Sequence, residues 1–93
     1  MTNGDSSREP SPIRIRLFAT ARVAVGTGRL DWPAPPDGIP ARDLIRALTA
    51  RYPDLGRIAT ASRYFLDGEL LTRMGTRVGP GHEFAVHPPY GGG

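Results

Sequence analysis

Alternating apolar and polar residues predict a half-buried β-strand at residues 13–18, IRIRLF. Its odd-numbered positions are aliphatic and would face a core, whereas its even-numbered positions hold two arginines and Phe18. The next eight residues predict a turn or a short helical piece that ends at Gly26, and residues 28–32 predict a second strand. Gly26 and Gly28 favour a hairpin connection between the two strands.

A helical spacing of apolar residues follows the proline-rich segment 33–38, PAPPDG, where regular structure is not expected because proline lacks the backbone N–H. Pro40 fits the first position of a helix, where the missing N–H costs nothing. Pro53 ends the helix because it disfavours the α conformation at the residue before it. The stripe predicted to face the core consists of Ala41, Leu44, Ile45, Leu48 and Tyr52.

Short strands are predicted in the last third of the chain. The segment RYFLDGELL predicts a strand, a turn at Asp67–Gly68 and a short return strand, and GPG at 79–81 predicts another turn. HEFAV predicts a final strand with Phe84 and Val86 on one face. The predicted order of elements is strand, strand, helix, short strands and strand. This order predicts a small α+β domain in which one amphipathic helix covers one face of a sheet.

The length and composition of the chain predict one domain with two polar ends. We expect residues 1–12 to form a disordered N-terminal tail, residues 13–88 to form the domain, and residues 89–93 to be a flexible glycine tail. No apolar run approaches the length that crosses a membrane. The N-terminal residues lack the apolar stretch of a signal peptide, so we expect a cytoplasmic protein.

Several chemistries are excluded by residue types that the sequence lacks. Without cysteine, the chain has no disulfide, thiolate metal site or cysteine nucleophile. Without lysine, it has no phosphate-binding loop of the GxxxxGK[ST] type and cannot accept an isopeptide bond on a side chain. All twelve basic residues are arginines, and the net charge of +3 is compatible with a nucleic acid or an acidic protein partner.

The polar residues do not predict a self-contained active site or a metal site. His82 and His87 are the only histidines, and five residues apart on a strand they would lie on opposite faces. Ser62 has no base beside it in the sequence. A basic face could combine arginines with Phe18 and Tyr64 for base stacking, but no recognition motif is present and a solvated sheet face is favoured. The arginines of such a face would be Arg14, Arg16, Arg63, Arg73 and Arg77.

The C-terminal sequence HPPYGGG, residues 87–93, is the strongest functional signal. Glycine loses the most conformational freedom on folding and buries no side chain, so three in a row contribute little to a folded structure. The segments that carry a family resemblance are IRIRLFATAR, ARDLIRAL, LDGELL and GPGHEFAVHPPYGGG. Through these segments the chain resembles the ubiquitin-like sulfur carriers, and among those carriers the small subunits of molybdopterin synthase. The resemblance spans residues 13–93 and implies a β-grasp fold, a mixed sheet wrapped around one helix.

The resemblance implies that the carboxylate of Gly93 is the reacting group. A ubiquitin-activating-like enzyme would adenylate it with ATP and magnesium, and a sulfurtransferase or cysteine desulfurase would supply the sulfur of a thiocarboxylate. The large synthase subunit would then place this sulfur on a pyranopterin precursor. The chain itself would be a non-catalytic carrier without bound cofactor, metal, membrane or nucleic acid, and Gly91 and Gly92 would let its tail thread into the activating enzyme. The implied partner-binding residues are Phe18, Arg22, Leu70 and His87.

Three departures from the family pattern leave the partner open. His82 stands where an aspartate is common, Tyr90 where a valine is common, and Gly91 where another small residue is usual. Related carriers serve thiamin, cysteine or thio-containing natural products with the same ending. A protein modifier would instead join Gly93 to lysines of its targets, and a basic binding module would have an incidental glycine end.

Overall fold

This computed structural model describes residues 11–89, so the predicted tails lie largely outside the described residues. Residues 1–10 and 90–93, and with them the three terminal glycines, are not described. The strands are β1 (Ile13–Leu17), β2 (Arg29–Trp32), β3 (Ile39–Pro40), β4 (Arg63–Leu66), β5 (Glu69–Leu70), β6 (Arg77–Val78) and β7 (Glu83–His87). The helices are α2 (Ala19–Val25), α3 (Ala41–Arg51), α4 (Gly56–Ala59) and the 3-10 helix η1 (Pro53–Leu55). Among these described helices, none has the length and apolar character that crossing a membrane requires.

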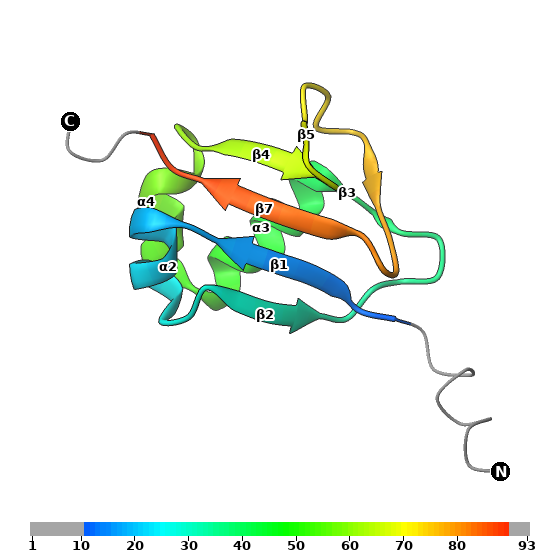
Figure 1. Cartoon of the computed structure of the whole chain (residues 1–93), viewed down its shortest axis with the longest axis horizontal. Helices are drawn as coiled ribbons and strands as arrows, with labels where there is room; N and C mark the ends of the chain where they lie inside the picture. The colour runs from blue at the N-terminus through cyan, green and yellow to red at the C-terminus, as the bar shows by residue number, and fades with distance from the viewer. Residues whose placement is uncertain (1–10, 90–93) are drawn as a thin grey trace, which may run out of the picture.

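The main sheet has five strands in the order β2-β1-β7-β4-β5. β1 and β7 are parallel and the other neighbours are antiparallel, so the sheet is mixed. Helix α3 lies across one face of the sheet, and the two-stranded sheet of β3 and β6 packs against the same helix (Figure 1). The predicted α+β class is confirmed, and a mixed sheet wrapped around one main helix is the β-grasp arrangement.

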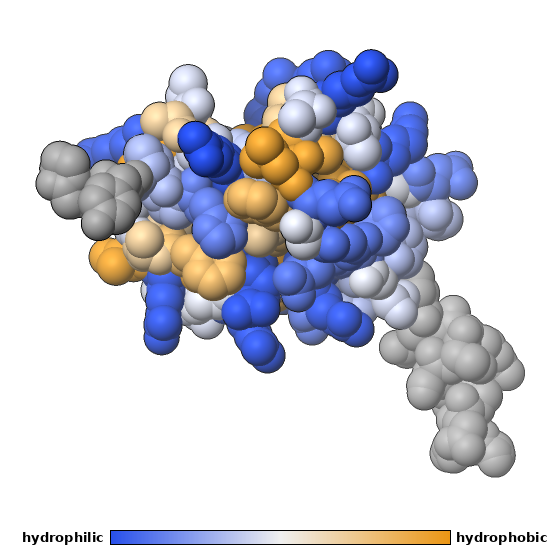
Figure 2. Space-filling model, turned by 45° about the horizontal axis from the view of Figure 1, so that its top comes forward, coloured by the Kyte–Doolittle hydropathy of each residue, from blue (hydrophilic) through white to orange (hydrophobic). Residues whose placement is uncertain are grey.

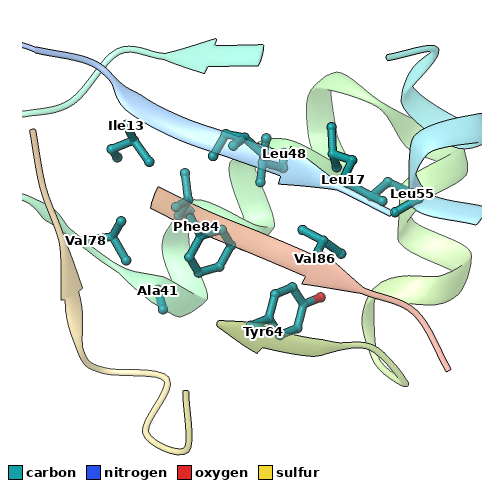
Figure 3. Close-up of a cluster of buried hydrophobic side chains, with 12 residues drawn as sticks. Ile13, Leu17, Ala41, Leu48, Leu55, Tyr64, Val78, Phe84 and Val86 are labelled. Atoms are coloured by element: carbon teal, nitrogen blue, oxygen red, sulfur yellow. The ribbon is translucent and has the colours of Figure 1, made fainter. Parts of the chain in front are cut away.

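The core lies between the five-stranded sheet and α3 (Figure 3). Every odd-numbered residue of β1 is at most 2% exposed, as its alternation predicts. Three residues of the predicted helical stripe are fully buried, whereas Ile45 and Tyr52 pack against the core while partly exposed. The parallel register places Ile15 beside Phe84. Burial of these side chains is the main favourable term in folding, at about 25 cal/mol per Å² of apolar surface.

The connection between β1 and β2 is a helix rather than the tight hairpin that Gly26 and Gly28 favoured. The two strands still pair antiparallel, with Ile15 opposite Leu30. Gly26 ends α2 with a φ of +94°, a left-handed conformation that glycine adopts without strain, and its N–H donates to the Arg22 carbonyl oxygen at 2.8 Å. The prediction of a short helical piece that ends at Gly26 is therefore confirmed.

Helix α3 begins one residue later than predicted. Pro40 precedes the helix instead of opening it, because its ψ of 140° is extended and it pairs with Arg77 in the small sheet. The first two backbone N–H groups of the helix donate to carbonyl oxygens of the loop 71–76 at 2.8 and 2.9 Å, which satisfies donors that have no partner inside the helix. The helix ends at Arg51, in keeping with the break that Pro53 imposes.

Two short elements that follow one another from Pro53, η1 and α4, are not predicted by the sequence pattern. Leu55 of η1 is 2% exposed, and η1 packs against α2 and α3, so this segment closes one end of the core. Apolar periodicity cannot reveal so short a segment, because a single buried residue defines no spacing.

Tyr64 points from β4 into the core (Figure 3). Its ring stacks on Phe84 with centroids 5.5 Å apart, and its hydroxyl donates to the Ala59 carbonyl oxygen at 2.7 Å. Burial disfavours the phenolate and raises the pKa of Tyr64 from 10.0 to about 12. The folded domain therefore holds this tyrosine in its neutral form at a pH where an unfolded chain would ionise it.

We expect the free energy of unfolding to fall as the pH rises from 10.0 to about 12. In this window Tyr64 is ionised in the unfolded chain and neutral in the folded one, so unfolding releases a proton and higher pH favours it. The stabilising contribution is complete below pH 10.0 and lost as the pH passes the folded pKa. Urea unfolding across this window measures the fall, which should be smaller in Tyr64→Phe. An equal fall in both proteins would contradict the assignment.

Candidate functional site

The candidate site lies on the outer face of the five-stranded sheet, which is the face turned away from α3. Paired residues on neighbouring strands point to the same side of a sheet. The pairing of Arg14 with Glu83 and of Arg16 with Ala85 therefore places all four on the outer face, opposite the buried side chains of β1. Phe65 of β4 also pairs with Ala85 and belongs to this face.

Phe18, His87 and Phe65 form an aromatic cluster where β1 and β7 end. The rings of Phe18 and His87 stack at 20° with centroids 4.2 Å apart, and Phe65 meets His87 edge-on at 69° and 4.7 Å. The Phe18 N–H donates to the Val86 carbonyl oxygen at 3.2 Å, which fixes the end of β1 against β7. Aromatic pairs of this kind contribute about 0.5–1.5 kcal/mol beyond the burial of area, so the cluster is held in place before any partner binds.

Leu70 extends the aromatic cluster onto β5. It pairs with Phe65 and, at 52% exposed, is one of the two large apolar side chains that lie exposed in residues 11–89. We call Phe18, His87, Phe65 and Leu70 the outer-face patch. In Figure 2, apolar residues lie in groups from the lower left to the upper centre of a surface that is otherwise mostly hydrophilic. An exposed apolar group set within polar surroundings is typical of a protein interaction site.

Phe65 is the member of the outer-face patch that the sequence analysis missed. The segment RYFL places Phe65 and Tyr64 on opposite faces of one strand, but the pattern does not say which of the two faces the core. The structure places Tyr64 in the core, at 7% exposed, so this ring is not available to stack on bases.

Arg22 lies beside Phe18, at the side of the patch where α2 begins. Its side chain is exposed, and its Cδ would lie 3.5 Å from a Cβ built on Gly28, so the arginine stem crosses the loop before β2. Arg22 and Phe18 line one groove. The structure thus brings three of the predicted partner-binding residues together, which are Phe18, Arg22 and His87. The fourth, Leu70, lies on the edge strand β5 and is linked to them only through Phe65.

The five arginines of the considered basic face do not form one surface. Arg14, Arg16 and Arg63 lie on the outer face. Arg77 instead lies in β6 and donates to two carbonyl oxygens of the loop before β3, at 3.4 and 3.2 Å. Arg73 lies on the loop after β5. A continuous basic track for a nucleic-acid backbone is therefore not built from these residues.

The end of β7 leads directly into the base of the tail at Pro88–Pro89. A groove of about 430 Å³ opens there, lined by Ala61, Arg63, Phe65, His87, Pro88 and Pro89. Because β1 and β7 are parallel, Ile13 and His87 lie at opposite ends of the sheet (Figure 1). The groove and the outer-face patch share Phe65 and His87, so a protein that holds the tail base would also contact the patch.

His82 and Ser62 are engaged in local hydrogen bonds. The Nδ1 atom of His82 accepts a hydrogen bond from the Gly79 N–H at 3.0 Å, and the Ser62 hydroxyl donates to the Ile58 carbonyl oxygen at 2.7 Å. Both side chains therefore stabilise turns. Within residues 11–89, no three histidine or carboxylate side chains come together in a way that could hold a metal ion.

No protein-family model matches the sequence, and neither does any curated protein. Among solved structures, the HVO 2177 protein of Haloferax volcanii has a TM-score of 0.74 and 27% sequence identity, and the match covers 89% of this chain and 87% of that protein.

Two further structural neighbours have names that bear on the resemblance. A Pyrococcus furiosus protein assigned as molybdopterin converting factor, subunit 1, has a TM-score of 0.75 and 18% identity, and the match covers 85% of this chain and 98% of that protein. The small archaeal modifier protein 1 of Methanosarcina acetivorans has a TM-score of 0.69 and 21% identity, over 91% of this chain and 99% of that protein. The expected likeness to ubiquitin-like carriers is confirmed in the fold.

Proposed function

We propose that the chain is a ubiquitin-like sulfur carrier that acts through the carboxylate of Gly93, with the pyranopterin precursor of molybdenum cofactor biosynthesis as the sulfur acceptor. The observation that carries the proposal is the continuity between the outer-face patch and the tail base. His87 belongs to both, and the sequence beyond Pro88–Pro89 ends in three glycines. The structural likeness to a molybdopterin converting factor subunit supports the same function.

The proposed reaction takes place at Gly93 within partner enzymes. In an activating enzyme, a carboxylate oxygen of Gly93 attacks the α-phosphorus of ATP, pyrophosphate leaves, and an acyl adenylate forms. A sulfide equivalent from the sulfur donor then forms a C–S bond at the carbonyl carbon as AMP leaves, which gives the thiocarboxylate. ATP and magnesium belong to the activating enzyme, and the large synthase subunit would receive the sulfur.

The residues before Gly93 suit this reaction. Pro88 and Pro89 have a fixed φ and therefore favour an extended tail base that leads away from the domain. Gly91 and Gly92 carry no side chain that would clash inside a narrow adenylation site. The sulfur would be carried on the terminal carbonyl, so the absence of cysteine from the chain is no obstacle.

A second candidate function is protein modification, which the likeness to the small archaeal modifier protein 1 favours. The same acyl adenylate would then react with a lysine amine of a target and release AMP. Because this chain has no lysine, it could not build lysine-linked chains on itself, but its single attachment to a target needs no lysine of its own.

Intact-mass spectrometry tests the proposal. The chain is incubated with ATP, magnesium, the adenylating enzyme from the same organism and sodium sulfide, and omission of ATP is the control. We expect a gain of about 16 Da, because sulfide at the acyl adenylate replaces one oxygen by sulfur. A stable adduct on lysines of other proteins would favour the modifier function instead. An unchanged mass together with the absence of ATP–pyrophosphate exchange would contradict both.

A further inference from the structure

A second groove, of about 370 Å³, lies between the end of β1, α2 and the start of β2. Three arginines, Arg16, Arg22 and Arg29, line it together with Phe18, and its other lining residues are uncharged. No carboxylate contributes to this groove within the described residues. We call it the arginine groove. The charged side chains that line it are thus all positive.

The arginine groove contains a charge arrangement that folding alone would disfavour. Arg16 of β1 and Arg29 of β2 are directly paired across the sheet. Like charges in this position destabilise a sheet, because the two side chains are neighbours on the same face. A local arrangement that opposes folding is expected where a site is kept for binding.

Two of the three arginines have no intramolecular partner among residues 11–89. Arg16 forms an ion pair with Glu83 at 3.8 Å and lies 5.3 Å from the centre of the Phe18 ring. In the described part of the chain, neither Arg22 nor Arg29 has a carboxylate within 4.0 Å. Within this part of the chain both guanidinium groups are left without an ion pair, and arginine can bind a carboxylate through two parallel N–H···O bonds.

The surroundings of the arginine groove limit what can occupy it. A neighbouring groove shares Arg16 and Arg29 but is also lined by Asp31 and Glu83, so negative charge borders the positive site. A nucleic-acid backbone, which needs a long positive track, would meet these two carboxylates. A short segment with carboxylates can pair with Arg22 and Arg29 without extending along the sheet as a nucleic-acid backbone would.

We infer that the arginine groove docks an acidic segment of the protein that receives the tail. This inference rests on the proposed function, because it assigns the partner contact beside the outer-face patch. Phe18 links the two regions: it lines the groove and stacks on His87 at the tail base. A partner that covers the patch is thereby brought over Arg22 and Arg29, and paired charges at this border would speed its association and fix its orientation.

The first experiment tests the groove without any activating enzyme. Fluorescein-labelled hexaglutamate is titrated against the full chain, and binding is followed by anisotropy and by NMR shifts of the arginine Nε–H signals. We expect shifts centred on Arg22 and Arg29, and an affinity loss of about three- to tenfold in Arg22→Gln/Arg29→Gln. The matched control, Arg42→Gln/Arg73→Gln, removes the same charge from exposed positions on α3 and the loop after β5 and should bind as the wild type does.

Three results would overturn the inference. The first is equal weakening in both double variants, which would show only the overall charge of the chain. The second is a set of shifts spread over arginines outside the groove. The third is tighter binding of a single-stranded oligonucleotide than of hexaglutamate at the same residues, which would indicate a nucleic-acid site.

ATP–pyrophosphate exchange separates this inference from the proposed function. In Arg22→Gln/Arg29→Gln we expect the KM of the activating enzyme for the chain to rise about three- to tenfold with kcat nearly unchanged, because the charges act on association and not on chemistry. The dependence of KM on salt should weaken as well. An unchanged KM would overturn the inference while the carrier function stands. A wild-type chain without exchange would refute the carrier function, and hexaglutamate binding would still report on the groove.

Discussion

Replacing Gly92 with valine should abolish adenylation of Gly93 or slow it by about a hundredfold or more, while the domain stays folded. Valine adds a branched Cβ where the tail must pass close to the backbone of the activating enzyme, and it disfavours any positive φ that glycine permits. A displacement of about 1 Å at a reacting group can cost roughly a hundredfold in rate. Position 92 follows the last strand of the domain, so the melting temperature should not change.

ATP–pyrophosphate exchange with the activating enzyme measures this effect, and Gly56→Val is its matched control. Gly56 is exposed on α4, and a Cβ there would meet only the Thr49 Cβ at 3.9 Å, an ordinary contact. The control should therefore exchange at the wild-type rate. Wild-type exchange in Gly92→Val would mean that the terminal glycines are incidental, and the carrier function would have to be abandoned.

Adding one residue after Gly93 should slow adenylation by a similarly large factor, but for a different reason. The tail would still consist of glycines, but the reacting carboxylate would be displaced by one residue from the α-phosphate of ATP. The same exchange assay distinguishes the two causes, because removal of the added residue by a carboxypeptidase should restore exchange in the extended chain and cannot do so in Gly92→Val.

The strands and the main helix could be predicted from the sequence because their patterns are local. The alternation in residues 13–18 identifies the core side of β1, and the spacing between Ala41 and Leu48 identifies the buried stripe of α3. Proline and glycine set most boundaries through their backbone restrictions. The boundary at Pro40 was misplaced because the pairing of that residue with Arg77 is a tertiary contact, which no local rule contains.

The candidate site could be predicted only in part, because the residues that form it come from strands far apart in the sequence. Phe18 was assigned correctly to the face opposite the core, since that face follows from β1 alone. The stacking of Phe18 on His87 requires that β1 and β7 be adjacent and parallel, and the role of Phe65 requires that β4 lie on the other side of β7. The arginine groove likewise depends on the pairing of Arg16 with Arg29 across two strands that a helix separates.

Substitution of Phe18 by alanine should weaken the complex with the activating enzyme or the large synthase subunit by about tenfold or more, as loss of an aromatic anchor does. Phe18 is half-buried on the outer face, outside the core cluster, so the fold should survive. The loss of its stacking on His87 should lower the free energy of unfolding by only about 0.5–1.5 kcal/mol.

Val23→Ala provides the matched control for Phe18→Ala, because Val23 is an apolar residue that is 80% exposed on α2 and takes no part in the ring stacking of Phe18, His87 and Phe65. Titration calorimetry should show near wild-type affinity for this control and the loss for Phe18→Ala, with circular dichroism confirming that both are folded. We expect His87→Ala to weaken binding of the partner as well, because the His87 ring contacts the rings of both Phe18 and Phe65. Unfolding of Phe18→Ala, with unimpaired binding in its folded fraction, would show that this phenylalanine holds the sheet together and that the partner binds elsewhere.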